Sequence, residues 1–423
     1  MPSGKILYTS LLFAGILICS YLFRNQNIQA INWTYPYCSG AANLDMSFQW
    51  KVGTEEYDKL VKLPEAEYKK YRHQRSSHTI LNQYNNFGYV IIVFIARNIF
   101  FEAGDLNAVI YLQIIIHALT VILIVSLLKT RSKKLLFIFL YGLNPFIIHF
   151  VTFPFYYFWT VIPCYLFCWF YLKRKTAGVY SIVPVTLLLY LSLLIRPTTV
   201  LVIVAVYVLL FLFARGRQKL VVFLGFLGFA TMAFLFDGKP KNPEKDESTV
   251  WHTAFIGFGA YPNSRNIEMK DSYLYDRYFD STKTIVSSSP ITGTFQNVST
   301  KNAYFGFAKN QYLSLLKEEK IRLLRNASLN MLEAFSYGYI IDHKTVTYAS
   351  IFVGLFIIGY AIYRRYYALG ICIFCYAATY TPFYPPIPAY HFGAFLVVFI
   401  LVTFLGDELL QAAVKASGRN KAR

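Results

Sequence analysis

The feature that most constrains this chain is a succession of long apolar runs, separated by short basic loops or by two long polar segments. A helix needs about 20 mostly apolar residues to cross the hydrocarbon core of a bilayer. We therefore predict an all-α polytopic membrane protein. The candidate runs are residues 6–23, 87–101, 106–128, 135–152, 155–172, 179–195, 198–214, 220–236, 346–362, 366–382 and 389–406.

Composition supports this interpretation. Charged residues make up only 15% of the chain and hydrophobic residues 56%, whereas a soluble domain usually carries about 25% charged residues. The formal net charge of +19 would indicate nucleic-acid binding in a soluble protein. Here the Lys and Arg residues fall in short clusters between apolar runs, which is the pattern that holds loops in the cytoplasm. The charge distribution therefore argues against nucleic acid as a partner.

The basic clusters also predict the topology. If the run at 87–101 does not cross the membrane, every later return to the cytoplasm is followed by basic residues; if it crosses, all those clusters move outside, against the positive-inside rule. That run is also short and contains Arg97. We expect about ten transmembrane helices in a cell inner (plasma) membrane, with both termini cytoplasmic.

Two long polar segments, about 25–105 and 237–345, then lie together on the periplasmic side. We expect an N-terminal membrane module at 1–236 that includes the first segment, a large periplasmic loop at 237–345, and C-terminal membrane helices with a basic cytoplasmic tail at 346–423. Apolar residues at helical spacing near the end of the loop predict an interfacial helix over about 308–335.

Motifs of soluble enzymes are missing from the sequence, which has no P-loop, no HExxH and no GxSxG. The apolar runs also lack deep carboxylates, which an ion-coupled transporter would usually need. No cluster of side chains demands a metal ion. Candidate chemistry is therefore confined to the outer segments and the ends of the spans.

The densest acidic site lies in the first outer segment, at Glu55 and Glu56, with Asp45 upstream. One of these carboxylates can act as a general base that takes a proton from an acceptor hydroxyl. The alternative is a solvated acidic turn or helix start, where acidic residues suit the local dipole. Residue types alone favour that structural alternative.

Two span ends carry residues suited to binding a phosphate. Arg196 precedes Pro197 at the outer end of one span, and Tyr390 and His391 lie at the outer mouth of the last. Arg binds phosphate through two parallel hydrogen bonds, although it can also serve as an interfacial anchor. For His391 the alternative is a residue of an aromatic belt at headgroup level.

An aromatic pair in the second outer segment is suited to a sugar. Trp251 can stack on a sugar ring and His252 can hydrogen-bond to it, because such side chains combine an apolar face with a polar edge. The alternative is that the pair packs this loop onto the membrane.

These residues, taken together, resemble the polytopic glycosyltransferases of the GT-C class. In that class a first span leads into an outer loop with a catalytic carboxylate, followed by a Tyr and an Arg-rich element. Glu55-Glu56-Tyr57 and the later stretch from Tyr71 to Arg75 look like that arrangement. Arg196-Pro197 and the stretch from Trp251 to Gly259 also resemble elements of some members. The commonest acidic residue of the class is Asp, so the assignment stays open among Asp45, Glu55 and Glu56.

The resemblance implies a donor sugar linked to undecaprenyl phosphate, as in bacterial and bacteriophage enzymes that decorate O-antigen with glucose. The catalytic base would be Glu55, Glu56 or Asp45. Basic and aromatic residues would bind the lipid-linked donor, and Trp251 and His252 would bind the sugar. A donor synthase and a flippase would act upstream, and a divalent metal is compatible with the reaction although no ligand set demands one. The donor-binding residues are expected to be Arg72, Arg75, Arg196, Tyr390 and His391.

Two other functions fit the same layout. An O-antigen or capsule polymerase is also multi-spanning with large outer loops, and a non-catalytic carrier or flippase of lipid-linked sugars would need no carboxylate. Both remain alternatives to a hexosyltransferase that acts on a surface polysaccharide.

Overall fold

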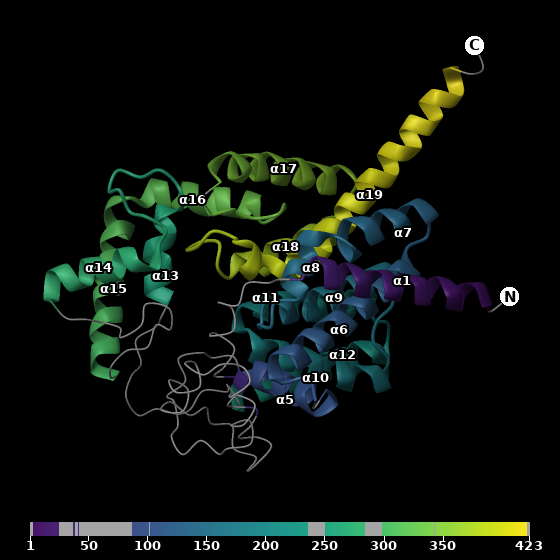
Figure 1. The fold of residues 1–423 in the computed structure, drawn as a ribbon, viewed down its shortest axis with the longest axis horizontal. Helices are drawn as coiled ribbons and strands as arrows, with labels where there is room; N and C mark the ends of the chain where they lie inside the picture. The colour runs from purple at the N-terminus through teal and green to yellow at the C-terminus, as the bar shows by residue number, and fades with distance from the viewer. Residues whose placement is uncertain are drawn as a thin grey trace. The chain divides into compact units, whose positions relative to one another are not determined.

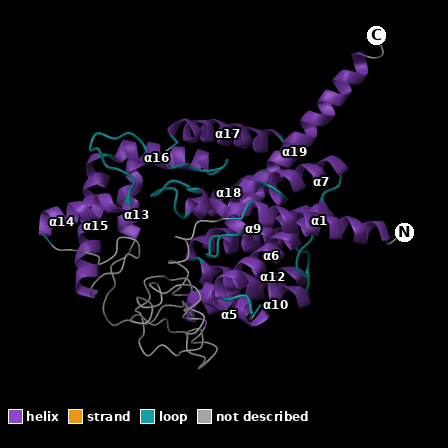
Figure 2. Ribbon diagram, viewed as in Figure 1, coloured by secondary structure: helices purple, strands orange, loops and turns teal. Residues whose placement is uncertain are grey.

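The computed structural model describes residues 3–24, 37–38, 41, 87–100, 102–235, 250–283, 298–341 and 343–420. Its regular structure over these ranges is entirely helical (Figures 1 and 2). The prediction of an all-α chain is therefore confirmed for the described residues. Two compact units divide the chain: unit 1 comprises Met1–Lys239, Tyr360–Cys372 and Phe392–Arg423, and unit 2 comprises Pro240–Gly359 and Ile373–His391.

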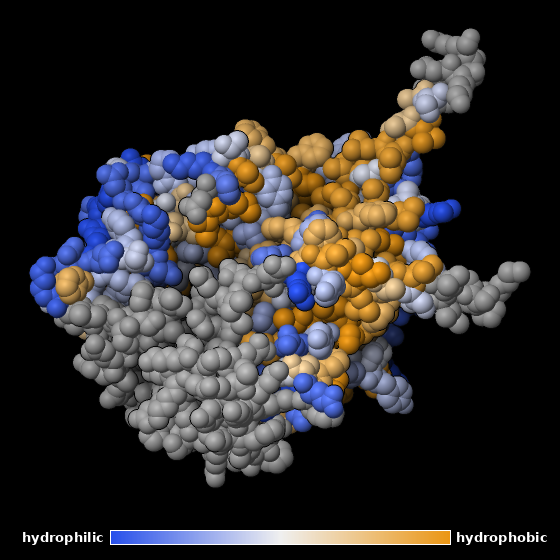
Figure 3. Space-filling view, in the orientation of Figure 1, coloured by the Kyte–Doolittle hydropathy of each residue, from blue (hydrophilic) through white to orange (hydrophobic). Residues whose placement is uncertain are grey.

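Most of the apolar runs form helices in unit 1. These helices are α1 (Ser3–Leu22), α5 (Phe87–Ile99), α6 (Asp105–Leu127), α7 (Arg131–Phe137), α8 (Pro145–Val151), α9 (Val161–Lys173), α10 (Val179–Ile195), α11 (Val200–Phe213) and α12 (Arg217–Leu235). Three further helices, α17 (Lys344–Tyr363), α18 (Tyr367–Ala378) and α19 (Pro388–Asn420), pass from one unit into the other. On the face drawn in Figure 3, apolar side chains cover much of unit 1.

Among the described residues, four helices are long and apolar enough to cross a membrane, namely α6, α12, α17 and α19. The bent pair of α7 and α8 makes a fifth if it is one span. These helices agree with a membrane protein, whereas the expected count of about ten spans is not confirmed by the described residues and stays a prediction. Several other apolar helices are shorter than a span needs: at 1.5 Å per residue, the 12-residue α18 rises only about 18 Å, against a hydrocarbon core of about 30 Å.

The run at 87–101, on which the predicted topology depends, forms the 13-residue helix α5. Such a helix rises about 20 Å, which is less than the core of a bilayer. Because α9 is also 13 residues long, length does not distinguish this run from the expected spans, and its failure to cross stays a prediction. The side of the membrane that each loop faces remains a prediction.

The run at 135–152, expected to be one continuous span, is broken. A π-helical turn at Ile138–Gly142 separates α7 from α8, and the axes of the two parts differ by 54°. Asn144 stabilises the break, because its Nδ2 donates to the Leu140 carbonyl over 2.8 Å and its Oδ1 accepts from the Phe146 amide over 2.9 Å. Pro145 then starts α8 at a position where no amide donor is needed. Hydropathy alone does not detect such a break.

One polar contact joins three helices of unit 1. The Tyr207 hydroxyl on α11 donates to Thr186 Oγ1 on α10 over 3.0 Å and lies 3.4 Å from the Gly225 carbonyl oxygen on α12. Gly225 itself contacts Ile182 so closely that a Cβ would overlap that side chain. Small residues and interhelical hydrogen bonds are the usual means by which apolar helices associate in lipid.

Unit 2 contains α13 (Val250–Gly257), a 3-10 turn (Phe258–Ala260), α14 (Asp271–Thr282), α15 (Val298–Glu318) and α16 (Lys320–Glu333). Its core is largely aromatic, with Phe255, Phe258, Tyr304 and Tyr312 buried. Hydrophilic side chains gather over α14 and α16 on the face drawn in Figure 3. The helix expected over 308–335 is wrong as one element: it breaks at Glu319, whose backbone leaves the helical region (φ −120°, ψ 30°).

Candidate functional site

The loop between α13 and α14 forms one wall of the candidate site, and glycines bring it close to its neighbours. A Cβ at Gly257 would overlap the Phe383 carbonyl oxygen, and one at Gly259 would overlap the backbone of Ile267 and Glu268. Only glycine allows such close approach of two backbone segments. The glycines in the Trp251-to-Gly259 stretch therefore have a packing role here.

The side chain of Asn263 makes four hydrogen bonds to the backbone of this loop. Its Nδ2 donates to the carbonyl oxygens of Tyr261 (3.2 Å) and Ile267 (3.0 Å). Its Oδ1 accepts from the amides of Arg265 (3.2 Å) and Ile267 (2.9 Å). Asn side chains that bond to nearby backbone groups are a frequent device for fixing turns. These four hydrogen bonds therefore fix the backbone of the loop that forms this wall of the candidate site.

Helix α16 anchors the same loop through a row of polar side chains. Asn326 Nδ2 donates to the Phe258 carbonyl oxygen over 3.3 Å, and Arg325 Nη2 donates to that of Pro262 over 3.3 Å. Oδ1 of the buried Asn330 accepts a 2.9 Å hydrogen bond from the Tyr261 hydroxyl. These bonds fix the orientation of the Tyr261 ring.

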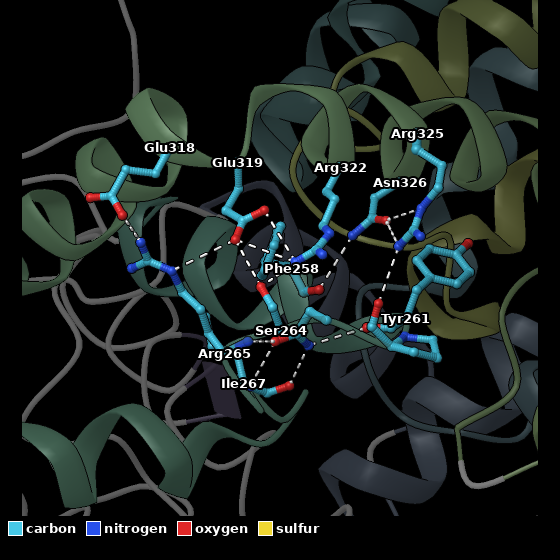
Figure 4. Close-up of polar contacts among 12 residues, drawn as sticks. Phe258, Tyr261, Ser264, Arg265, Ile267, Glu318, Glu319, Arg322, Arg325 and Asn326 are labelled. Atoms are coloured by element: carbon cyan, nitrogen blue, oxygen red, sulfur yellow. Dashed lines mark hydrogen bonds and ion pairs between the residues drawn. The ribbon is translucent and has the colours of Figure 1, made fainter.

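A cluster of charged side chains holds the outer part of the loop, and Figure 4 shows it. Glu319 accepts from Ser264 Oγ over 2.9 Å and pairs with Arg322 at 3.2 Å. Arg322 also donates to Ser264, and Arg265 pairs with Glu318. The break between α15 and α16 thus places two glutamates beside the loop.

A cavity of about 970 Å³ lies between this loop and the segment that precedes α17. Ligand pockets in proteins range from about 300 to 1,000 Å³. The lining mixes polar, apolar and aromatic side chains and includes two lysines. It is formed by Gly259, Ala260, Tyr261, Pro262, Asn263, Asn266, Ile267, Glu268, Met269, Lys270, Tyr339, Ile340, Ile341, His343 and Lys344.

Next to this wall, His252 lies between two partners. Its Nδ1 accepts from the Tyr304 hydroxyl, and its Nε2 donates to Asp271 Oδ1 over 3.1 Å. Burial, with the charges of Tyr275 and Asp271, raises the pKa of Tyr304 far above its usual range, so that hydroxyl remains a proton donor. Asp271 directly follows Lys270 in the cavity wall, and its side chain is 74% exposed.

This geometry assigns different roles to the members of the cluster. Both ring nitrogens of His252 are used, so the ring orients Asp271 and has no lone pair left for a substrate. The Asp271 carboxylate lies in the first turn of α14 and is exposed. The carboxylate is therefore the group of this cluster that can accept a proton from a substrate.

The predicted Trp251 contacts other aromatic and basic side chains of unit 2. Its ring centroid lies 6.0 Å from that of Tyr312, and Lys309 Nζ lies 5.9 Å from the ring. Both predicted sugar-binding residues, Trp251 and His252, thus lie on α13 and take part in packing. The sugar-binding role stays a prediction.

Arg196 ends α10 in unit 1. Its Nε donates to Thr198 Oγ1 over 3.0 Å, and its guanidinium lies 5.1 Å from the Tyr156 ring and 5.7 Å from the Tyr157 ring. Arg often stacks in this way on aromatic faces. The arrangement holds the guanidinium at a helix end, and phosphate binding there stays a prediction.

His391 is fully buried in unit 2, with both ring nitrogens bonded. Its Nε2 donates to the Ala334 carbonyl oxygen over 2.6 Å, and its Nδ1 accepts from the Tyr380 hydroxyl over 2.6 Å. A phosphate contact through this ring would require one of these bonds to break. The neighbouring Tyr390 accepts a 3.1 Å hydrogen bond at its carbonyl oxygen from Tyr376.

The remaining predicted site residues, Asp45, Glu55, Glu56, Arg72 and Arg75, lie outside the described residues. Across the part of the chain that the structure describes, no group of three or more His, Cys, Asp or Glu side chains could hold a metal ion. The predicted site residues that are described fall on two different units, with Arg196 in unit 1 and the others in unit 2.

Sequence reasoning missed two carboxyl groups. Asp271 could have been noticed as an acidic residue at a helix start, but its pairing with His252 joins residues 19 positions apart and has no local signal. Glu333 ends a buried polar stripe with Asn326 and Asn330 on α16. Their spacing of four and then three residues places them on one helix face. The polar stripe could therefore have been predicted from the sequence.

Comparison with known proteins gives no relative: no family model, no curated protein and no solved structure matches this chain.

Proposed function

We propose that this chain is a membrane glycosyltransferase that moves a hexose from an undecaprenyl-phosphate donor to a surface polysaccharide on the periplasmic face. One observation carries the proposal: the cavity of unit 2, whose lining includes two tyrosines, also includes Lys344, the first residue of α17. Helix α17 is long and apolar enough to cross a membrane. A phosphate bound near Lys344 would therefore lie where a lipid tail can enter the bilayer.

The lining provides suitable contacts for both parts of such a donor. Tyr261 and Tyr339 offer aromatic faces on which a sugar ring can stack. The hydroxyl of Tyr339 donates to the Ala260 carbonyl oxygen over 2.8 Å, which fixes its ring. Lys344 offers an ammonium group that can neutralise the charge of the leaving phosphate. The ammonium of Lys270, also in the lining, pairs with Glu268 at 2.9 Å.

The reaction also needs a base for the acceptor hydroxyl. The sequence prediction assigns this role to Asp45, Glu55 or Glu56, and Asp271 is a further candidate among the described residues. A carboxylate on the face of the sugar opposite the phosphate would take the hydroxyl proton as the new glycosidic bond forms and the sugar–phosphate bond breaks. Such a single displacement inverts the anomeric centre, by analogy with inverting glycosidases.

The test is mass analysis of the surface polysaccharide from cells with and without the gene. Loss of a side-branch hexose with unchanged chain length is the expected result. Shortened chains would instead indicate a polymerase, and an unchanged polysaccharide would contradict both enzymatic functions.

Complementation with variants then tests the chemistry. Asp45→Asn, Glu55→Gln, Glu56→Gln and Asp271→Asn are each compared with Asp276→Asn, which removes an exposed carboxylate from the same helix as Asp271. At least one of the four should lose the hexose, because a general base contributes about 10²- to 10⁴-fold to the rate. If all four restore it at the full rate, the proposed mechanism is wrong.

A further inference from the structure

A second cavity, of about 260 Å³, lies in unit 1 between the end of α9 and the start of α10. Its lining includes two lysines, and most of the other lining side chains are aromatic or apolar. It is lined by Tyr165, Leu166, Trp169, Phe170, Lys173, Lys175, Thr176, Ser181 and Val185. The cavity belongs to a different unit from the candidate site described above.

The turn after α9 places both lysines at the cavity. Arg174 adopts a left-handed conformation (φ 50°, ψ 41°) that ends the helix between them. The ammonium of Lys173 lies 5.0 Å from the centre of the Trp169 ring. A cation held over an aromatic face keeps its N–H donors available to an anion. The turn therefore brings two positive charges into the lining of one cavity.

The start of α10 adds to this positive potential. Its first residue is Val179, and the Gly178 cap contributes no side-chain hydrogen bond to the helix end. Helix N-termini carry a partial positive charge. Ser181, in the first turn, lines the cavity.

The rest of the lining is suited to acyl chains. Leu166, Phe170 and Val185 form an apolar floor. Leu188 lies seven residues after Ser181, hence on the same face of α10, and is 42% exposed. An exposed apolar side chain on this face offers a surface against which an acyl chain can lie. Tyr165 and Trp169 are of the type enriched at headgroup depth in membranes.

We propose that this cavity binds the phosphate headgroup of an anionic phospholipid, with Lys173 and Lys175 as its cationic contacts and an acyl chain along Leu188. A free phosphate would satisfy the lysines but leave the apolar floor unused. The lipid is thus the occupant that uses both parts of the lining. This inference is independent of the proposed reaction.

The chain offers a matched control. Lys219 lies 5.3 Å from the Phe211 ring, next to a cavity of about 210 Å³ in the same unit. That cavity is lined by Val204, Tyr207, Val208, Phe211, Leu212, Val222, Phe223 and Phe226, without a charged residue. Arg217→Ala with Lys219→Ala removes the same charge as Lys173→Ala with Lys175→Ala.

The experiment is native mass spectrometry of the full-length protein in neutral detergent, titrated with phosphatidylglycerol, phosphatidylcholine or glycerol phosphate. The wild type should bind phosphatidylglycerol most tightly. The Lys173→Ala/Lys175→Ala variant should lose about 25-fold in that affinity, because each basic residue near an anionic lipid contributes on the order of 1 kcal/mol, or about fivefold. The control pair should stay within about twofold of the wild type.

Three results would overturn the inference: unchanged binding by the lysine pair, an equal loss in the control pair, or binding of glycerol phosphate as tight as that of the lipid. If the double variant does not fold, the test uses Lys175→Ala alone, which should lower the affinity for phosphatidylglycerol about fivefold. Trp169→Leu, which keeps both charges, should lower the affinity about two- to fivefold because the cation–π contact is lost.

Discussion

The Tyr261 hydroxyl donates a 2.9 Å hydrogen bond to Asn330 Oδ1, and the two buried residues join the cavity loop to α16. Asn330 in turn donates to the Thr381 carbonyl oxygen over 2.9 Å. Glu333, three residues further along α16, is fully buried. Among the described residues, neither of its carboxyl oxygens has a hydrogen-bond partner of normal geometry.

The first prediction concerns pH. Burial raises the pKa of Glu333 from its ordinary 4.5 to about 8, and the nearby Tyr261 hydroxyl offsets part of the rise. Between these values the folded protein binds a proton that the unfolded chain has lost, so stability falls as pH rises from about 4.5 to about 8. Glu333→Gln should match the wild type at pH 4.5 and have the higher Tm at pH 9.

Thermal unfolding of the full-length protein in detergent at pH 4.5, 7 and 9 measures this difference. Asp280→Asn, which neutralises an exposed carboxylate of the same unit, is the control and should show no growing advantage with pH. A Glu333→Gln variant with the same Tm difference from the wild type at all three pH values would show that Glu333 is not held neutral.

The second prediction is that Tyr261→Phe destabilises the protein. The substitution leaves the buried Asn330 Oδ1 without its Tyr261 donor, which costs about 1–3 kcal/mol. Tyr180→Phe, at a side chain that is 96% exposed, should have no measurable effect. Equal Tm values for Tyr261→Phe and the wild type would mean that this hydrogen bond does not hold the cavity wall.

The third prediction separates the roles of Asp271 and His252. If Asp271 is the base, Asp271→Asn should lower kcat about 10²- to 10⁴-fold with little change in KM. His252→Gln removes only the partner that orients the carboxylate, so it should lower kcat less and shift the pH dependence of kcat. Asp276→Asn should retain wild-type kinetics. A purely structural His252 would instead lower Tm and leave the pH profile of the remaining activity unchanged.

The helical class was predictable because it depends on hydrophobicity summed over whole runs. The run at 106–128 and the helix α6, Asp105–Leu127, differ by one residue at each end. The number of spans is harder to predict than the helical class, since it depends on where helices stop. Local features such as the left-handed Arg174 and the Asn144 cap set those ends without changing the hydropathy.

The candidate site was harder to predict than the fold. The sequence identifies His252 as a candidate, but its partners Tyr304 and Asp271 come from other helices. His391 fits a phosphate contact by sequence position, whereas burial and two hydrogen bonds occupy its ring in the structure. In both cases the role depends on tertiary neighbours, which a single sequence does not specify.

The fourth prediction concerns the carboxylate of Asp407. The buried Asp407 on α19 accepts from Ser132 and Gln411 and pairs with Lys133 at 3.4 Å. Asp407→Asn removes the charge from this network and should destabilise the protein by about 1.5–3 kcal/mol, the usual contribution of hydrogen bonds to a charged group. Glu408→Gln, which affects a more exposed pair with Arg364, should cost less than about 1 kcal/mol. Similar Tm losses in the two variants would contradict a special role for Asp407.

The fifth prediction compares two glycines on α17. A Cβ at Gly354 would overlap the backbone carbonyl of Leu332 on α16, whereas a Cβ at Gly359 would meet nothing within 4 Å. Gly354→Ala should therefore force the two helices apart and destabilise unit 2, at a cost of about 1–3 kcal/mol typical of overpacking. Gly359→Ala should be neutral or stabilising by up to about 1 kcal/mol, because Ala favours helix more than Gly does. Because both changes add one methyl group to the same helix, a higher Tm in both variants would show that α16 and α17 do not pack at Gly354.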